Sequence, residues 1–272
     1  MRQIAEQLPG RGLRVGAVGC GTSYYISQSY ASYREESGRG TTDAFPASVT
    51  PRRRWDVLIA LSRSGTTTEV INALGSSQAR GTLALTGTEG SPITNSAGVT
   101  LCASFANERS VVQTRFATTA LLILLSSVGY PIERSIRDAR RRAYELPEPL
   151  LEGRSHFVFV GAGWTHGIAN EAALKLREMA ACWSESYPAL EYRHGPIAAA
   201  GSHTMVWGFG EVDRSLAAAV AATGAAVHWP HCDPVASLVG VQQLGLRLAA
   251  ASNLNPDQPL HLSRSVVLDG SP

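Results

Sequence analysis

The stretch Leu13-Arg-Val-Gly-Ala-Val-Gly-Cys-Gly-Thr-Ser23 begins with an apolar run and ends in a glycine turn that carries hydroxyl side chains. A short apolar run bounded by glycine is typical of a buried strand. A helical stretch follows through Tyr33. The turn does not complete a Rossmann fingerprint, because Tyr24 stands where the third glycine belongs. The stretch therefore predicts a strand, a tight turn and a helix, the repeating unit of α/β folds.

The same order of elements recurs along the chain. Expected strands lie at 13–18, 55–61, 82–86, 157–160, 204–209 and 225–229, and further helices at 68–79, 111–129, 168–181 and 216–223. Strands that alternate with helices predict parallel sheets covered on both faces. A basic stretch with two prolines, 134–154, interrupts the pattern and predicts a linking helix and linker. We therefore expect a duplicated α/β unit, with one domain at 1–150 and a second at 151–272.

Composition limits the classes of function. The chain has 272 residues, a formal net charge of +2 and 44% hydrophobic residues, which suits two globular domains and argues against a nucleic-acid or membrane partner. The four cysteines form no CxxC pair, as expected for free thiols in a reducing cytoplasm. No cationic, apolar leader precedes the first strand, and the apolar run 121–128 is too short to span a bilayer. We expect a cytoplasmic protein without a cofactor.

A hydroxyl-rich loop, Ser62-Arg-Ser-Gly-Thr-Thr67, lies between an expected strand and an expected helix. Unpaired N–H groups and the helix dipole favour an anion at such a place. The hydroxyls of Ser62, Ser64 and Thr67 can add donors around a phosphate, while Gly65 lets the backbone approach. The loop is no Walker motif, and a helix N-cap with extra serines is the alternative. Both this loop and the 19–23 turn follow strands of one expected sheet, at the edge where such sheets bind ligands.

One lysine, Lys175, stands among 24 basic residues. Glu171, Lys175 and Glu178 share a helix face, although a surface ion-pair ladder would give the same pattern. The turn around His194 presents an imidazole that titrates near neutrality. A carboxylate, an ammonium and an imidazole together suit proton transfer next to a carbonyl.

Five motifs in order resemble the sugar isomerase (SIS) family, with two tandem SIS domains over nearly the whole chain. The resemblance is strongest to the isomerase half of glucosamine-6-phosphate synthase and to stand-alone aminosugar-phosphate deaminase/isomerases. The motifs are Gly19-Cys-Gly-Thr-Ser23, Ser62-Arg-Ser-Gly65 with Thr67, Glu171-Ala-Ala-Leu-Lys-Leu-Arg-Glu178, Arg193-His-Gly-Pro196 and the tail Asp257-Gln-Pro-Leu-His-Leu-Ser-Arg-Ser-Val266. The resemblance implies an α/β fold in which each domain is a flavodoxin-like three-layer sandwich.

The resemblance also implies roles for individual residues. The phosphate of a sugar would be held by Ser62, Arg63 (through its backbone), Ser64, Gly65 and Thr67. The sugar chain would contact Cys20, Gly21, Thr22, Ser23, Val111, Gln113 and Arg264. Glu178 would move a proton between C1 and C2, with Lys175 beside it. His194 would open the sugar ring of the partner subunit's substrate, so an active homodimer is implied.

The sequence departs from the family in three places. We expect no glutamine-hydrolysing domain to supply ammonia. The tail lysine of the family is replaced by Arg264, whose guanidinium cannot form an imine. The second half has Phe209-Gly-Glu211 in place of a Ser-x-Ser-Gly loop, so one phosphate site per chain is expected.

The favoured function is an aldose–ketose isomerase or deaminase that acts on an aminosugar phosphate such as glucosamine-6-phosphate. One alternative is a deglycase for a phosphorylated fructosamine (an Amadori compound). The other is a non-catalytic sugar-phosphate sensor, against which the presence of both Glu178 and His194 argues. No metal is expected, because the run from His228 to Asp233 matches no standard zinc spacing.

Overall fold

The computed structural model describes residues 1–142, 152–211 and 213–268. The chain divides into two compact units, which are described separately. Unit 1 comprises Met1–Pro131 and His261–Pro272, and unit 2 comprises Ile132–Leu260. The predicted domain boundary near residue 150 falls in 143–151, outside the described residues. The division seen in the structure places the helix that follows Pro131 in unit 2 and the end of the chain in unit 1.

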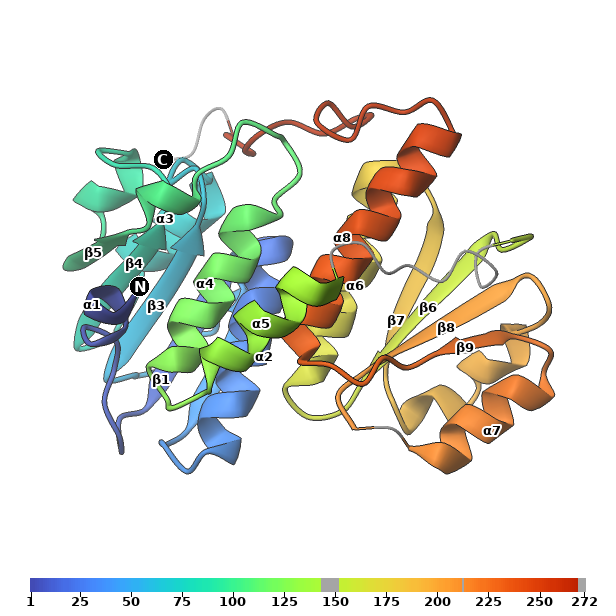
Figure 1. Cartoon of the computed structure of the whole chain (residues 1–272). Helices are drawn as coiled ribbons and strands as arrows, with labels where there is room; N and C mark the ends of the chain where they lie inside the picture. Colours follow the sequence, from blue (N-terminus) through green and yellow to red (C-terminus); the bar gives the residue numbers. More distant parts are fainter. Residues whose placement is uncertain (143–151, 212, 269–272) are drawn as a thin grey trace. The chain divides into compact units, whose positions relative to one another are not determined.

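The described residues of unit 1 form a five-stranded parallel sheet of order β2-β1-β3-β4-β5 (Figure 1). The strands are β1 (Val15–Gly19), β2 (Thr42–Pro46), β3 (Val57–Ser62), β4 (Gly81–Thr86) and β5 (Val99–Cys102). The helices are α1 (Arg2–Ala5), α2 (Thr22–Glu36), α3 (Thr68–Gly75) and α4 (Arg115–Ser126), with 3₁₀ turns η1 (Ala47–Val49), η2 (Pro92–Asn95) and η3 (Ser104–Ala106). The helix α2 packs against α4 and β1. The helix α3 packs on a core that includes Val18, Leu58 and Ala60. The predicted α/β class with helix-flanked parallel sheets is confirmed.

The strand order reverses between β1 and β3. The chain passes from β1 to β2 on one side and then returns to place β3 on the other side of β1. At such a reversal, the loops that leave the two strands diverge and open a crevice at the carboxyl edge of the sheet. The register Val18↔Ala60 fixes β1 beside β3, so the turn at Gly19 and the loop at Ser62 begin at this one edge.

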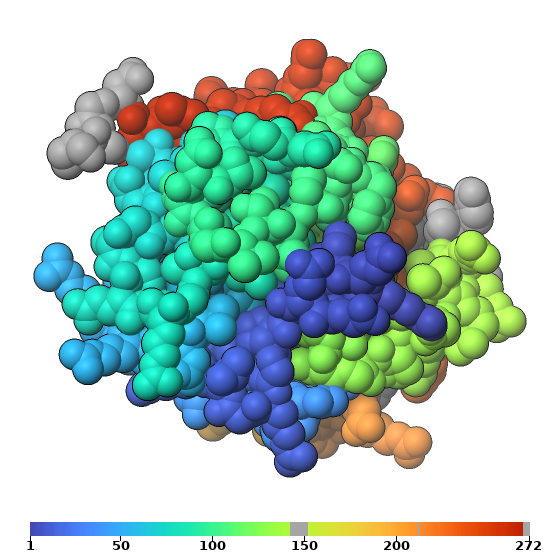
Figure 2. Space-filling model, turned by 90° about the vertical axis from the view of Figure 1, so that its left-hand side faces the viewer, coloured from blue at the N-terminus to red at the C-terminus, as the bar shows by residue number. Residues whose placement is uncertain are grey.

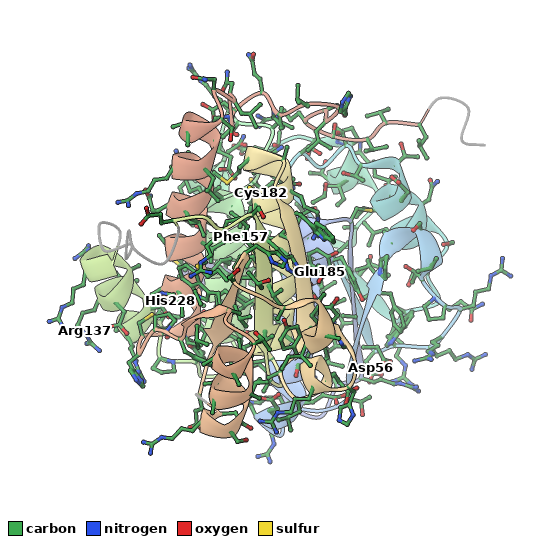
Figure 3. The ribbon with its side chains drawn as sticks, turned by 90° about the vertical axis from the view of Figure 1, so that its right-hand side faces the viewer. Asp56, Arg137, Phe157, Cys182, Glu185 and His228 are labelled. Atoms are coloured by element: carbon green, nitrogen blue, oxygen red, sulfur yellow. The ribbon has the colours of Figure 1, made fainter. Side chains whose placement is uncertain are left out.

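The described part of unit 2 holds a four-stranded parallel sheet of order β7-β6-β8-β9. The strands are β6 (His156–Gly161), β7 (Trp183–Pro188), β8 (Thr204–Phe209) and β9 (Ala226–His228). The helices are α5 (Ile132–Arg142), α6 (Thr165–Ala180), α7 (Arg214–Ala222) and α8 (Pro234–Ala251), with 3₁₀ turns η5 (Glu191–Arg193) and η6 (Pro196–Ala199). The helix α8 packs against both α5 and α6. Phe157 and Glu185, labelled in Figure 3, lie on opposite faces of the sheet, because Phe157 pairs with Ser184.

Three strands and two helices, the short α1 and the long α8, had no counterpart among the elements predicted from the sequence. The strands β2, β5 and β7 are all edge strands. They are short or polar: β5 has 4 residues, β2 ends in Pro46, and β7 carries Glu185. The helix α8 contains Gly240 and Gly245, which weaken its helical signal. A Cβ at Gly245 would lie 2.8 Å from the sulfur of Met179, so the glycine permits the close packing of α8 on α6.

The first prediction concerns the tight turn after β1. A Cβ at Gly19 would lie 2.6 Å from the backbone carbon of Ser23. Gly19→Ala should therefore destabilise the protein by about 1–3 kcal/mol, the usual cost of overpacking, which urea unfolding measures. The matched control is Gly75→Ala at the end of α3, where a Cβ meets nothing within 4 Å. Equal stability of the two variants would contradict this account of the turn.

Candidate functional site

The loop between β3 and α3 folds around its own hydroxyl groups. Ser62 Oγ accepts the N–H of Gly65 at 3.1 Å and lies 3.3 Å from Thr67 Oγ1. Ser64 Oγ accepts both the N–H and the hydroxyl of Thr66, at 3.2 and 3.0 Å. Ser62 is buried, whereas Ser64, Thr66 and Thr67 are partly exposed. The partly exposed hydroxyls therefore lie directly before the first turn of α3, where a helix attracts an anion.

The backbone of this loop requires glycine at position 65. Gly65 has φ +67°, and a Cβ there would lie 2.0 Å from Ser91 Oγ. The carbonyl of Gly65 accepts the N–H of Ile93 at 2.9 Å. Close packing against the segment around Ser91 thus fixes the course of the loop, and no other residue fits.

The turn after β1 lies at the same edge of the sheet. Gly21 has φ +52° and directly precedes α2, whose first residues Thr22 and Ser23 are buried. Burial, and next the charge of Glu69, raise the pKa of Cys20 to about 11. The thiol of Cys20 is therefore protonated at neutral pH and offers a neutral contact, not a nucleophile.

A third segment, Asn107–Thr114, is held at the start of α4 by Glu108. The carboxylate of Glu108 accepts the N–H groups of Thr114, Arg115 and Phe116 at 3.0–3.1 Å, and the Thr114 hydroxyl at 2.9 Å. This buried acid caps the helix and complements its dipole. This cap could not be predicted from the sequence, because a glutamate 7 positions before the first residue of the helix matches no standard capping pattern.

The two predicted sugar contacts of this segment are Val111 and Gln113, and both are partly buried. Gln113 Oε1 is buried without a hydrogen-bond partner among the described residues. A buried acceptor without a donor costs roughly 1–3 kcal/mol. The amide oxygen of Gln113 is therefore a suitable acceptor for a ligand hydroxyl.

Residues 261–268, here called the tail, lie against these loops. Figure 2 shows the red tail beside the teal and green residues of unit 1. Arg264 donates to the carbonyl of Arg109 and to Asn107 Oδ1, each at 3.0 Å. Ser265 Oγ accepts the hydroxyl of Thr66 at 2.9 Å. The structure thus brings the predicted contact Arg264 to the Asn107–Thr114 segment, with its guanidinium bound to protein oxygens.

In unit 2, the helix α6 carries a buried cluster of charges. Lys175 and Glu171 are both fully buried, and Lys175 Nζ lies 3.4 Å from Glu171 Oε1. Lys175 also donates a hydrogen bond to Glu178 Oε2, and the side chain of Glu178 keeps 19% exposure. The alternative of a surface ion-pair ladder is therefore wrong.

The charge state of Lys175 follows from its surroundings. Burial lowers the pKa of this lysine, but the charges of Glu171 and Glu178 outweigh burial, and the pKa lies above its usual value. The ammonium is therefore protonated at neutral pH. Such a group can orient Glu178 or attract an oxygen, but it cannot act as an amine nucleophile.

His194 lies on an exposed turn after η5. The preceding Arg193 donates to Asp213 Oδ1 at 3.2 Å and to Ser215 Oγ at 2.6 Å. Asp213 in turn caps α7 through the N–H of Leu216. The turn is thus fixed to the start of α7, while the imidazole of His194 stays accessible.

Residues 13–127 match the family model described as SIS domain. Residues 13–127 are therefore similar to a SIS domain. The matched residues all lie in unit 1, and they include the Ser62–Thr67 loop, the glycine turn and the Asn107–Thr114 segment.

Beyond the matched residues, the chain also resembles glutamine–fructose-6-phosphate aminotransferases. The chain is 28% identical over 319 residues to a glutamine–fructose-6-phosphate aminotransferase [isomerizing] from Methanothermobacter thermautotrophicus, over 98% of the chain and 53% of that relative. It is 30% identical to the Yersinia pseudotuberculosis protein of the same name, over 71% of the chain and 37% of the relative. The chain thus spans about half the length, or less, of these relatives.

Solved structures give the same picture. A glucosamine-6-phosphate deaminase from Thermotoga maritima superposes with a TM-score of 0.81 at 27% identity, over 94% of this chain and 91% of that one. The C-terminal domain of glucosamine-fructose-6-phosphate aminotransferase from Francisella tularensis gives a TM-score of 0.78 at 19% identity, over 95% of this chain and 88% of that one, and supports the fold alone.

Across the described residues, no helix combines the length and apolarity needed to cross a bilayer.

The second prediction concerns the buried charges on α6. Lys175→Met should cost about 3–5 kcal/mol of folding free energy, because it removes the cation from buried carboxylates. The double variant Lys175→Met/Glu171→Gln should recover part of that loss. Urea unfolding at pH 7 measures both. A single variant as stable as the wild type would contradict the buried cluster.

The third prediction concerns how the contribution of Lys175 to the free energy of unfolding depends on pH. The pKa of Lys175 is raised above the ordinary lysine value of 10.5. The stabilisation of the folded protein by protonated Lys175 is therefore fully present below the ordinary lysine pKa. It is lost as the pH rises through the higher pKa that Lys175 has in the folded state. The stability difference between the wild type and Lys175→Met should stay constant from neutral pH to about 10 and shrink above it. A difference that already shrinks below pH 9 would contradict the raised pKa.

Proposed function

We propose that this protein is an enzyme that binds an aminosugar phosphate, such as glucosamine-6-phosphate, and interconverts its aldose and ketose forms with release or addition of ammonia. The observation that carries the proposal is the pairing of Glu178 with the buried ammonium of Lys175. A carboxylate oriented in this way is suited to abstract a proton next to a carbonyl. The names of the relatives and of the structural neighbours support the same class of reaction.

The Ser62–Thr67 loop would bind the phosphate. The N–H groups before α3 and the hydroxyls of Ser64 and Thr67 supply donors, and the helix dipole favours the dianion. Beyond the phosphate, the amide of Gln113 and the side chain of Val111 would contact the sugar chain, together with residues of the turn Cys20, Gly21, Thr22 and Ser23. These are neutral groups, which suits a polyol.

The chemistry would proceed by proton transfer. His194 would assist the opening of the ring, which places a carbonyl at C1. Glu178 would then take the proton from C2, and the electrons of that C–H bond would form the C1–C2 double bond of an enaminol, which keeps the nitrogen on C2. Return of the proton to C1 gives the C2 imine of the ketose, and water hydrolyses this imine to the ketose and ammonia; addition of ammonia is the reverse. For His194, we propose that it acts on the substrate of a partner subunit in a homodimer.

Arg264 would not replace the family's tail lysine as a nucleophile. A guanidinium cannot form an imine, and that of Arg264 is bound to the carbonyl of Arg109 and to Asn107 Oδ1. Proton transfer by Glu178 needs no imine at this position. The tail would therefore contribute by position and not by covalent chemistry.

The fourth prediction tests the role of Glu178. Glu178→Gln should lower kcat by about 10²–10⁴-fold, the range for loss of a general base. Turnover of glucosamine-6-phosphate is measured by ammonia release and by ketose formation. The affinity for inorganic phosphate, measured by titration calorimetry, should stay at the wild-type value. The matched control is Glu152→Gln at an exposed position of the same unit.

Three results would decide between the functions. Full activity of Glu178→Gln would exclude this residue as the base. Binding of glucosamine-6-phosphate by the wild type without any turnover would favour the sensor. Turnover of a phosphorylated fructosamine with release of its amino acid, and none of glucosamine-6-phosphate, would favour the deglycase.

A further inference from the structure

The side chain of Arg63 joins two distant segments of unit 1. Arg63 is 1% exposed. Its Nη1 donates to the carbonyl of Ser110 at 2.7 Å, and its Nη2 donates to the carbonyl of Arg264 at 3.0 Å. These acceptors lie in the Asn107–Thr114 segment and in the tail. One buried guanidinium therefore contacts both segments from within the Ser62–Thr67 loop.

The backbone of Arg63 is itself fixed to the end of β4. Its carbonyl accepts the N–H of Gly87 at 3.1 Å and the hydroxyls of Thr86 and Thr88 at 3.2 and 3.0 Å. The guanidinium therefore projects from a well-anchored backbone. A side chain anchored at its base can transmit position to the groups that it binds.

The tail is held mainly by polar contacts. Its large apolar side chains Leu262, Val266, Val267 and Leu268 are 46–62% exposed. The tail makes hydrogen bonds with the Ser62–Thr67 loop and the start of α3: Thr66 with Ser265, the N–H of Thr68 with the carbonyl of Val266, and the N–H of Leu268 with Thr68 Oγ1. Arg264 of the tail also donates to the carbonyl of Arg109 and to Asn107 Oδ1. Loss of a charged hydrogen bond should therefore weaken the docking of the tail appreciably.

We propose that Arg63 is a positioning residue, whose side chain holds the Asn107–Thr114 segment and the tail against the Ser62–Thr67 loop. In this way it sets the space for the part of the ligand beyond the phosphate. The effect on the ligand space rests on the proposed function, whereas the holding of the two segments by Arg63 does not. The resemblance implied only a backbone contact of Arg63 to the phosphate. Its side chain adds a second, structural role.

The role needs arginine. A guanidinium presents donors in a rigid planar fork, so that two carbonyls from different segments can be bound at once. An ammonium is a single point on a flexible chain, and a glutamine amide is shorter and uncharged. Neither lysine nor glutamine can therefore satisfy both Ser110 and Arg264 with the same geometry.

Hydrogen exchange of the folded protein tests the structural part. Arg63→Gln should speed exchange of amides in 109–114 and 264–268 by about 10- to 150-fold, the range for loss of a hydrogen bond from a charged donor. The Leu268 amide is the direct reporter, since it donates to Thr68 Oγ1. Arg63→Lys should restore little of the protection. The matched control is Arg80→Gln, whose side chain is 87% exposed and should change neither segment.

Binding tests the functional part without requiring turnover. Arg63→Gln should lower the affinity for glucosamine-6-phosphate about tenfold or more. The affinity for inorganic phosphate should fall less, because the N–H groups of the loop stay in place. Removal of residues 261–272 should have the same kind of effect. In a double-mutant cycle the two changes should be less than additive, because they break one shared contact.

Wild-type exchange rates in both segments of a folded Arg63→Gln variant would overturn the proposal. Fully additive losses in the cycle would also overturn it. If Arg63→Gln does not fold, the variant without residues 261–272 tests the proposal. That variant must bind glucosamine-6-phosphate more weakly and inorganic phosphate nearly as well as the wild type. Its amides in 109–114 must stay protected from exchange. If the wild type binds no inorganic phosphate, the proposed function is refuted, and the hydrogen-exchange result still tests the structural part of the proposal.

Discussion

The reversal of strand order between β1 and β3 is the constraint on which the site in unit 1 depends. It places two strand-to-helix loops at one edge of the sheet and lets them diverge there. Both loops meet steric limits that only glycine satisfies: Gly19 lies against the backbone of Ser23, and Gly65 against Ser91. The Ser62–Thr67 loop begins at this edge, and close packing at Gly65 fixes the course of its backbone. The anion-binding site that we propose would therefore depend on topology and close packing, with few dedicated residues.

Buried charges organise what surrounds these loops. Glu108 caps α4 with its carboxylate, and Arg63 binds carbonyls of two segments. In unit 2, Lys175 binds the carboxylates of Glu171 and Glu178. A charge without partners is costly to bury, so each such group fixes its partners firmly once they are bound. This property makes buried arginine, lysine and glutamate suitable for positioning a site.

Much of the fold and part of the site could be predicted from the sequence. The central strands β1, β3, β4, β6 and β8 were found because they are apolar and bounded by turns. The edge strands β2, β5 and β7 were not predicted, because they are short or polar, whereas the edge strand β9 was. The helix α8 was not predicted, because its glycines serve packing and weaken the helical signal. The Ser62–Thr67 loop could be predicted as a local pattern. The roles of Glu108 and of the Arg63 side chain could not, because their partners depend on how distant segments are folded together, as with Arg63 and Arg264.

The most direct test of this account is a map of the amides that a sugar phosphate protects. Wild-type protein would be titrated with glucosamine-6-phosphate and followed by amide NMR or hydrogen exchange. The account predicts saturable changes at the Ser62–Thr67 loop, at the start of α3 and at the turn around Gly21. Saturable changes confined to other parts of the chain, or no saturable change at all, would contradict it.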